Sequence, residues 1–235
     1  MALPKIANPK FNITLPSTGV KVSFRPFIVK EEKILLMAVQ SNDDASIIQA
    51  VKDVVQSCVD ESIDVAKLPY FDTEYLFLNI RAKSIGEMVD LEYRHNSGIN
   101  YKGEECTTVT PVKVNIEEVK VEKLDGHNNV IMLDDNMGIK LKYNTIDDIS
   151  VLAKSEEDLS LLANCIDSVF QGDEVFEPDN QQDAIEFIEG LNSDQFSKIM
   201  QFFNSMPKLR HTIKYKCAGC GQEDEVKLEG LSDFF

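Results

Sequence analysis

The residues most suited to specific chemistry are two cysteines near the end of the chain, in the segment Cys217-Ala218-Gly219-Cys220-Gly221. Two thiolates at this spacing, with a glycine directly after the second, can aim both sulfurs at one Zn²⁺ ion. A closed structural zinc site needs four ligands, and the chain has no second pair of cysteines at this spacing. The segment is therefore half of a metal site, and the candidates for the missing ligands are His95, Cys106 and His211.

Three interpretations of the cysteine pair stay open. His95 and Cys106 bracket a polar loop between two predicted strands, so they would complete a Cys3His zinc site if two hairpins lie together. Alternatively, the segment is a knuckle-shaped turn without a metal, held by its flanking strands alone. A redox pair requires a helix N-terminus after the cysteines to lower their pKa. The acidic residues 223–225 and a predicted strand follow instead, and we expect them to raise that pKa.

The sequence carries no pattern typical of catalysis. None of the three histidines lies near a serine or cysteine in a known nucleophile motif, and the chain has neither a P-loop nor a dinucleotide-binding glycine fingerprint. His127, which two asparagines follow, is predicted to lie in a surface loop. We therefore predict that the protein is not an enzyme and has no cofactor, apart from the open question of structural zinc.

The net charge of −16 is distributed unevenly along the chain. Residues 147–194 contain fourteen Asp or Glu and one basic residue, Lys154, and thus carry −13 of that charge. Such a field repels the phosphates of nucleic acids and anionic lipids. We therefore predict a basic protein surface as the partner and no nucleic acid. The alternative is that these carboxylates form only a solvated helix face.

Length and composition are those of a soluble globular protein. A chain of 235 residues with 43% hydrophobic residues can form one large domain or two smaller ones. No apolar run approaches the ~20 residues of a membrane span, and the first residues do not follow the signal-peptide pattern. Five cysteines at irregular spacing favour reduced thiols over a disulfide framework. These features favour the cytosol.

The periodicity of apolar residues predicts the elements that must position these groups. Alternation predicts four β-hairpins, at residues 11–24, 88–116, 128–143 and 209–228, and the last of them carries the cysteine pair. Helical spacing predicts three helices within residues 30–86, and Asp72 is the expected N-cap of the third. Beyond Tyr143 the pattern predicts one or two helices over residues 149–169, an exposed break at 173–180 and two further helices over 184–206.

This order of elements predicts an α+β fold, with strands in separate hairpins rather than in βαβ units. We expect a mixed domain of residues 1–143, followed by an acidic helical segment of residues 144–235 that returns to a zinc-ribbon-like C-terminal hairpin. The two parts either form separate domains or pack as one. The chain ends in Phe234-Phe235, which either insert into a partner's groove or fold back on their own hairpin.

Six stretches carry a family resemblance: residues 1–5, 15–19, 24–36, 206–209, 215–221 and 228–235. In their order and spacing they resemble the baseplate hub proteins of T4-like contractile-tailed bacteriophages, the hub subunit and its assembly-factor relatives. The resemblance covers nearly the whole chain, and none of the stretches is a catalytic signature. It implies a virus-encoded, non-enzymatic protein, made late in infection, which helps to build the hub in the host cytoplasm. Whether the protein stays in the virion tail or leaves as a chaperone is left open by the resemblance.

The resemblance implies other hub or tail proteins as partners and no particular oligomeric state. Together with the charge, it suggests as partner-binding residues Asp173, Glu174, Glu177, Asp179, Phe234 and Phe235. The alternative function is a zinc-ribbon adaptor in transcription or RNA binding, which needs a basic, aromatic hairpin around the cysteines. Residues 214–216 are suited to that role, and the acidic residues 223–225 oppose it.

Overall fold

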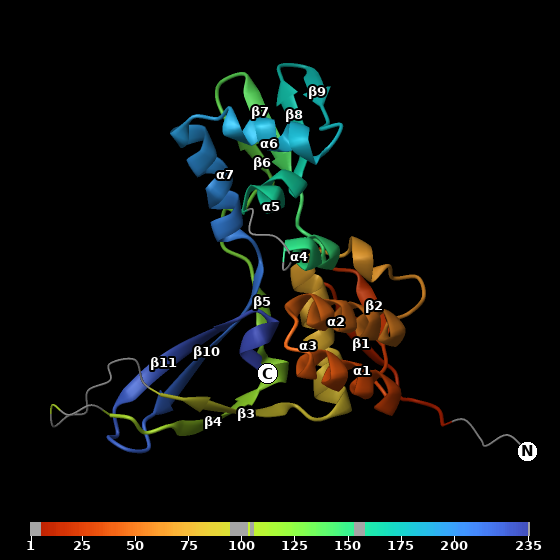
Figure 1. Cartoon of the computed structure of the whole chain (residues 1–235), viewed down its shortest axis with the longest axis vertical. Helices are drawn as coiled ribbons and strands as arrows, with labels where there is room; N and C mark the ends of the chain where they lie inside the picture. The colour runs from red at the N-terminus through yellow and green to blue at the C-terminus, as the bar shows by residue number, and fades with distance from the viewer. Residues whose placement is uncertain (1–5, 95–102, 104–105, 153–157, 235) are drawn as a thin grey trace, which may run out of the picture.

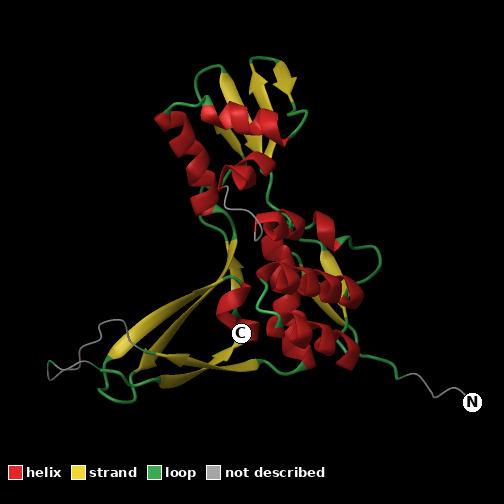
Figure 2. Ribbon diagram, viewed as in Figure 1, coloured by secondary structure: helices red, strands yellow, loops and turns green. Residues whose placement is uncertain are grey.

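The computed structural model describes residues 6–94, 103, 106–152 and 158–234 and confirms the α+β fold. Three parts are visible in Figure 1: a helical body, an arm of long strands and a distal lobe in which a small sheet is covered by helices. Figure 2 shows that the helices gather in the body and the lobe, whereas the arm consists almost entirely of strands. None of the helices in the described ranges has the length and apolar composition that crossing a membrane requires.

The body contains three helices and the predicted N-terminal hairpin. Strands β1 (Phe11–Thr14) and β2 (Lys21–Phe24) pair antiparallel beside helices α1 (Val29–Gln40), α2 (Asp44–Cys58) and α3 (Tyr70–Ser84). The side chain of Asp43 caps α2 by accepting a hydrogen bond from the Ser46 N–H at 3.0 Å. Helix α3 is buried on nearly all sides, and it therefore forms the centre of the body.

Asp72 is not the N-cap that the sequence predicts. Helix α3 begins after Pro69, and Asp72 lies in its first turn with its side chain fully buried. There it accepts hydrogen bonds from the backbone N–H and the hydroxyl of Ser17, in the β1–β2 turn. The carboxylate therefore ties the N-terminal hairpin to the central helix. These hydrogen bonds satisfy the buried carboxylate, so it does not serve as a helix cap.

The arm consists of two hairpins. Strands β3 (Met88–Tyr93) and β4 (Thr110–Asn115) form one of them, and β10 (Lys208–Lys216) and β11 (Glu223–Glu229) form the other. The short strand β5 (Lys120–Glu122) pairs with the inner end of β10 and makes a three-stranded sheet. The turn between β10 and β11 lies at the free end of the arm, away from the helices (Figure 1).

The distal lobe is inserted between two neighbouring strands. The chain leaves the arm after β5 and returns at β10, and Leu209 lies opposite Val121 in that pair. Between them lies a sheet in the order β6-β7-β8-β9, formed by Val130–Met132, Met137–Leu141, Ile166–Gln171 and Glu174–Phe176. Helices α5 (Asp158–Asn164), α6 (Gln181–Glu189) and α7 (Ser193–Ser205) belong to the lobe, and α4 (Ile146–Leu152) connects it to the body.

Strands β8 and β9 correct part of the sequence interpretation. Residues 166–169 are predicted to be helical and residues 173–180 to be a break, but both segments contribute strands to this sheet. Leu159, Leu161 and Leu162 stand just before β8 and give the segment a helical spacing. The pairing of β8 with β7 prevails because it buries Ile166 and leaves the carboxylate of Asp167 to pair with Lys140 at 2.7 Å.

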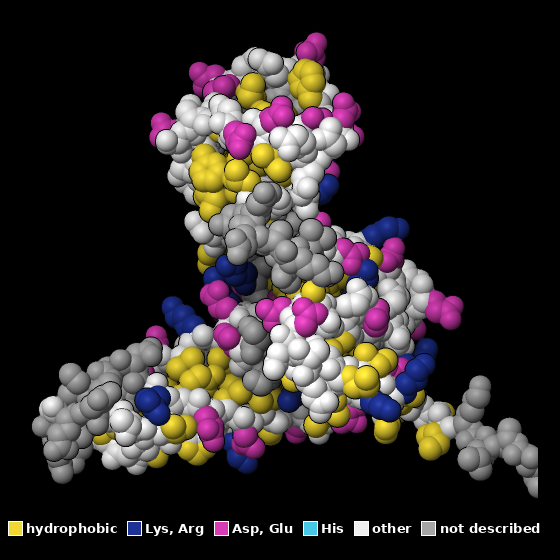
Figure 3. All heavy atoms as spheres, viewed as in Figure 1, with side chains coloured by type: hydrophobic (Ala, Val, Ile, Leu, Met, Phe, Trp, Pro, Cys, Tyr) yellow, Lys and Arg dark blue, Asp and Glu magenta, His cyan; other side chains and the backbone are white. Residues whose placement is uncertain are grey.

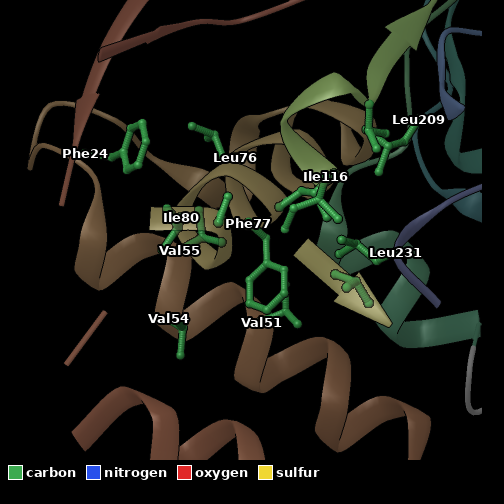
Figure 4. Close-up of a cluster of buried hydrophobic side chains, with 14 of the residues drawn as sticks. Phe24, Val51, Val54, Val55, Leu76, Phe77, Ile80, Ile116, Leu209 and Leu231 are labelled. Carbon is green, nitrogen blue, oxygen red and sulfur yellow. The ribbon is translucent and has the colours of Figure 1, made fainter. Parts of the chain in front are cut away.

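Buried side chains form two clusters. The larger one fills the body and the inner arm, and Figure 4 shows members that come from both ends of the chain, including Phe24, Phe77, Leu209 and Leu231. The smaller one fills the distal lobe, with Ile139, Ile166 and Phe202 among its members. The division into domains of residues 1–143 and 144–235 stays a prediction. Both clusters contain residues from either side of this boundary.

Candidate metal centre

Three cysteine sulfurs meet at the outer end of the arm. The Sγ atoms of Cys106, Cys217 and Cys220 all lie within 4.8 Å of one another, and those of Cys106 and Cys217 are 3.8 Å apart. Cys106 precedes β4, whereas the other two lie in the turn between β10 and β11. Cys106 and Cys217 are buried and Cys220 is half-buried. The fold thus brings together three of the four residues that the sequence suggests for a Cys3His site.

Two glycines shape the turn that carries Cys217 and Cys220. The Cys217 N–H donates to the Gln222 carbonyl at 2.8 Å, and the Gly221 N–H donates to the Cys217 carbonyl at 2.9 Å. Gly221 has a φ of 73°, in the left-handed region that glycine adopts without steric cost. A Cβ at Gly219 would clash with the side chain of Thr108, so the segment before β4 packs directly on this turn.

Further contacts join the two hairpins beside the sulfurs. The Ala218 N–H donates to the buried hydroxyl oxygen of Thr110, the first residue of β4, at 3.0 Å. The rings of Tyr93 and Tyr215, from β3 and β10, lie with their centroids 5.9 Å apart. These contacts hold Cys106 and the turn in one place without a covalent link.

Backbone hydrogen bonds set the electrostatics of the cysteine pair. The N–H groups of Cys220 and Gly219 bond to the Cys217 sulfur and lower the pKa of Cys217 to about 6. The Gln222 N–H lowers the pKa of Cys220, but burial and the neighbouring sulfurs of Cys217 and Cys106 outweigh it, so this pKa is raised. The expectation that the acidic residues after the pair raise its pKa is therefore wrong for Cys217, because backbone donors prevail.

The other sequence candidates for metal ligands do not reach the sulfurs. In the part of the chain that the structure describes, no histidine or carboxylate joins the three cysteines. His211 lies in β10, opposite Leu228 of β11, and is not part of the cluster. His95 lies outside the described residues, and its role as a ligand stays a prediction.

The proposed partner-binding carboxylates gather around the edge strand β9. Asp173 lies just before β9, Glu174 is its first residue, and Glu177 and Asp179 follow it. All four side chains are exposed. None of the ion pairs among the described residues includes any of the four. Their exposed positions allow these side chains to face a partner, and Glu177 also lies close enough to Lys140 for their charges to interact.

Of the two C-terminal phenylalanines, the structure describes only Phe234. Phe234 is the last residue of the 3₁₀ helix η3 (Leu231–Phe234), which packs its buried Leu231 into the body. Phe235 lies outside the described residues. A role for the two phenylalanines in partner binding stays a prediction.

Comparison with known proteins supports the family resemblance that the sequence stretches near the two ends of the chain indicate. The model of a family described as T4 bacteriophage base plate protein matches residues 7–235. The chain belongs to this family. Its role is therefore structural, in the baseplate of a phage tail and in contact with other tail proteins. Neither the curated proteins nor the solved structures contain a match.

Sequence reasoning missed a second structural centre of this baseplate protein, at the neck of the lobe. His127 is half-buried rather than at the surface, and its Nδ1 and Nε2 atoms lie 2.9 Å from Ser205 Oγ and from the Tyr143 hydroxyl. Its ring stacks on Tyr143 and contacts Phe202. The partners are far apart in sequence, so the two asparagines after His127 were the only local signal, and they indicated a loop.

Proposed function

We propose that this protein is a non-enzymatic component of the baseplate hub, which works by binding other hub proteins while the tail is assembled in the host cytoplasm. Membership of the baseplate family supports the structural role, and the resembling stretches at both ends of the chain support the hub. The observation that carries the proposal is the outer edge of the distal lobe, where the edge strand β9 lies among exposed carboxylates.

The edge strand β9 combines apolar and acidic groups. Val175 and Phe176 are 66% and 50% exposed, and large apolar side chains so exposed on the edge strand of a sheet are typical of a binding surface. Beside β9 is a cavity of about 310 Å³, lined among others by Met137, Phe176 and Phe187 together with Glu177 and Asp183. A partner with basic residues around an apolar side chain fits such a surface, because the charges steer it and the cavity receives the apolar group.

The charge distribution favours a protein partner at the lobe. In Figure 3 the Asp and Glu side chains surround the upper lobe, while most Lys and Arg lie on the lower part of the face shown. The concentration of negative charge in residues 147–194 would speed the approach of a basic surface and make it sensitive to salt.

The arm does not favour the alternative, an RNA-binding or transcription adaptor. Across the β10–β11 pair, Lys214 lies opposite Glu225 and Lys216 lies opposite Glu223. Each lysine therefore has a carboxylate beside it, and the hairpin offers no basic stripe for a phosphate backbone.

The test is a binding measurement between the purified full chain and the purified hub proteins of its phage. We expect one of them to bind, with an association rate that falls about tenfold or more from low to high salt. Neutralising the four carboxylates of Asp173, Glu174, Glu177 and Asp179 to their amides should lower that rate to a similar extent.

A matched control neutralises four exposed carboxylates outside the lobe's outer edge, those of Glu61, Glu87, Glu92 and Asp125. This variant has the same net charge as the test variant and should bind like the native protein. Equal losses in both variants, or binding that is indifferent to salt, would contradict docking at β9. Turnover of a substrate by the purified protein would contradict a non-enzymatic role.

A further inference from the structure

The three sulfurs have the dimensions of three corners of a metal tetrahedron. A Zn–S bond of about 2.3 Å places the sulfurs of a tetrahedral site about 3.8 Å apart. The Sγ atoms of Cys106 and Cys217 are 3.8 Å apart, and Cys220 Sγ lies within 4.8 Å of both. No sulfur–sulfur distance in the cluster therefore exceeds the tetrahedral value by more than about 1 Å.

The hydrogen bonds around the sulfurs are those of a thiolate ligand set. Backbone N–H groups of Gly219 and Cys220 and the hydroxyl group of Thr110 bond to the Cys217 sulfur, and the Gln222 N–H bonds to the Cys220 sulfur. Donors directed at sulfur are the outer-shell partners that orient metal-bound thiolates. A turn that only reversed the chain would need none of these contacts.

The place of the cluster gives a metal a structural task. Among the described residues, the arm has two hairpins and no helix at its outer end, and few side chains are buried there, among them Val112, Ile213 and Tyr215. Cross-links or metals usually stabilise parts that have so small a core. One ion bound to Cys106 and to the β10–β11 turn would fasten the two hairpins at their free ends.

We propose that Cys106, Cys217 and Cys220 bind one structural Zn²⁺ ion that joins the β3–β4 hairpin to the β10–β11 hairpin. Three thiolates come from the described residues, and the fourth ligand is a water molecule or a group outside the cluster. The site is independent of the proposed docking at β9, which lies in the distal lobe.

The test measures metal in the full-length protein, purified under reducing conditions without chelator and dialysed against trace zinc. We expect about one zinc per chain, and binding weakened more than about 100-fold in Cys106→Ser and in Cys217→Ser, because even loss of an outer-shell partner costs about 10- to 100-fold. Co²⁺ added to the metal-free protein should give the intense thiolate charge-transfer and d–d bands of a four-coordinate site, and Cys106→Ser should lose intensity in both.

Cys165→Ala is the matched control, because Cys165 is a buried cysteine in the distal lobe, outside the cluster. It should keep its zinc. Circular dichroism of each variant separates loss of the site from loss of the fold, and the metal content of the native chain does not depend on any variant. Absence of zinc from the native chain, zinc retained in Cys106→Ser, or a disulfide between two of these cysteines under reducing conditions would overturn the proposal.

Discussion

The carboxylate of Glu74 accepts a hydrogen bond at 3.0 Å from the backbone N–H of Leu231, and thereby holds the last 3₁₀ helix against the central helix of the body. Glu74 is almost completely buried. Burial raises the pKa of Glu74 from 4.5 to about 7, although the bonds from Leu231 and Tyr70 oppose this shift. The attachment of the C-terminal segment therefore includes an acid that titrates near neutral pH.

The stability of the protein should consequently depend on pH through Glu74. Between pH 4.5 and about 7 the folded state holds the proton more tightly than the unfolded state, so the free energy of unfolding falls as the pH rises, by up to about 3 kcal/mol. Urea unfolding at several pH values should show that Glu74→Gln removes most of this dependence. Glu87→Gln, at an exposed position, is the control, and parallel pH curves for Glu74→Gln and the native protein would contradict the prediction.

His127 should contribute to stability with the opposite pH dependence. Burial, with the charge of Lys123, lowers the pKa of His127 below 6.5, so stability is lost as the pH falls below 6.5 and the ring gains a proton. At pH 7.5, His127→Ala should lower the free energy of unfolding by about 1–3 kcal/mol, because it removes two hydrogen bonds and two ring contacts at the neck of the lobe. His211→Ala, outside this neck, is the comparison in thermal unfolding, and equal losses would mean that the neck contacts add nothing.

Gly138 should tolerate no larger side chain. It lies opposite Phe170 in the β7–β8 pair, and a Cβ at this position would overlap the Phe170 ring. Gly138→Ala should therefore lower the free energy of unfolding by about 1–3 kcal/mol. At Gly190 a Cβ would have ordinary contacts 3.5 Å away, so Gly190→Ala should change stability by less than about 1 kcal/mol. A smaller loss at Gly138 than at Gly190 would show that the ring moves aside.

Two cysteines outside the cluster should be inert in the folded protein. Burial raises the pKa of Cys58 to about 11 and that of Cys165 to about 12, and neither side chain is accessible. We expect iodoacetamide at pH 8 to leave both unmodified, as judged by peptide mass mapping, until urea unfolds the chain. Labelling of all five cysteines in urea is the control, and rapid alkylation of Cys58 in the native protein would contradict its burial.

Local sequence patterns predict the elements whose hydrogen-bonding partners lie nearby in the sequence. The hairpins β1–β2 and β10–β11 follow from alternation and turn residues, and the helix α2 follows from helical spacing. Local patterns do not identify the strand with which a short segment pairs. Strand β5 has only three residues and pairs with the distant β10, and β8 needs β7 to become a strand.

The candidate site shows the same division. The spacing of Cys217 and Cys220 marked the turn, and the expected position of Cys106 in the other hairpin named it as a ligand candidate. The distances that join the three depend on the packing of two hairpins, which the contacts of Thr110 and Tyr93 bring about. The position of Cys106 beside a hairpin loop favoured it over His211, which lies within a strand.

The pairing of β5 with β10 also has an evolutionary consequence. Because the chain departs and comes back through adjoining strands, the outer turns of the lobe can be lengthened or shortened while the pairing of β5 with β10 stays the same. Residues 144–147 are the exception, because Ile146 and Asp147 contact the body. Under the proposed docking at β9, related phages could thus alter which neighbour binds the lobe and keep the remaining scaffold.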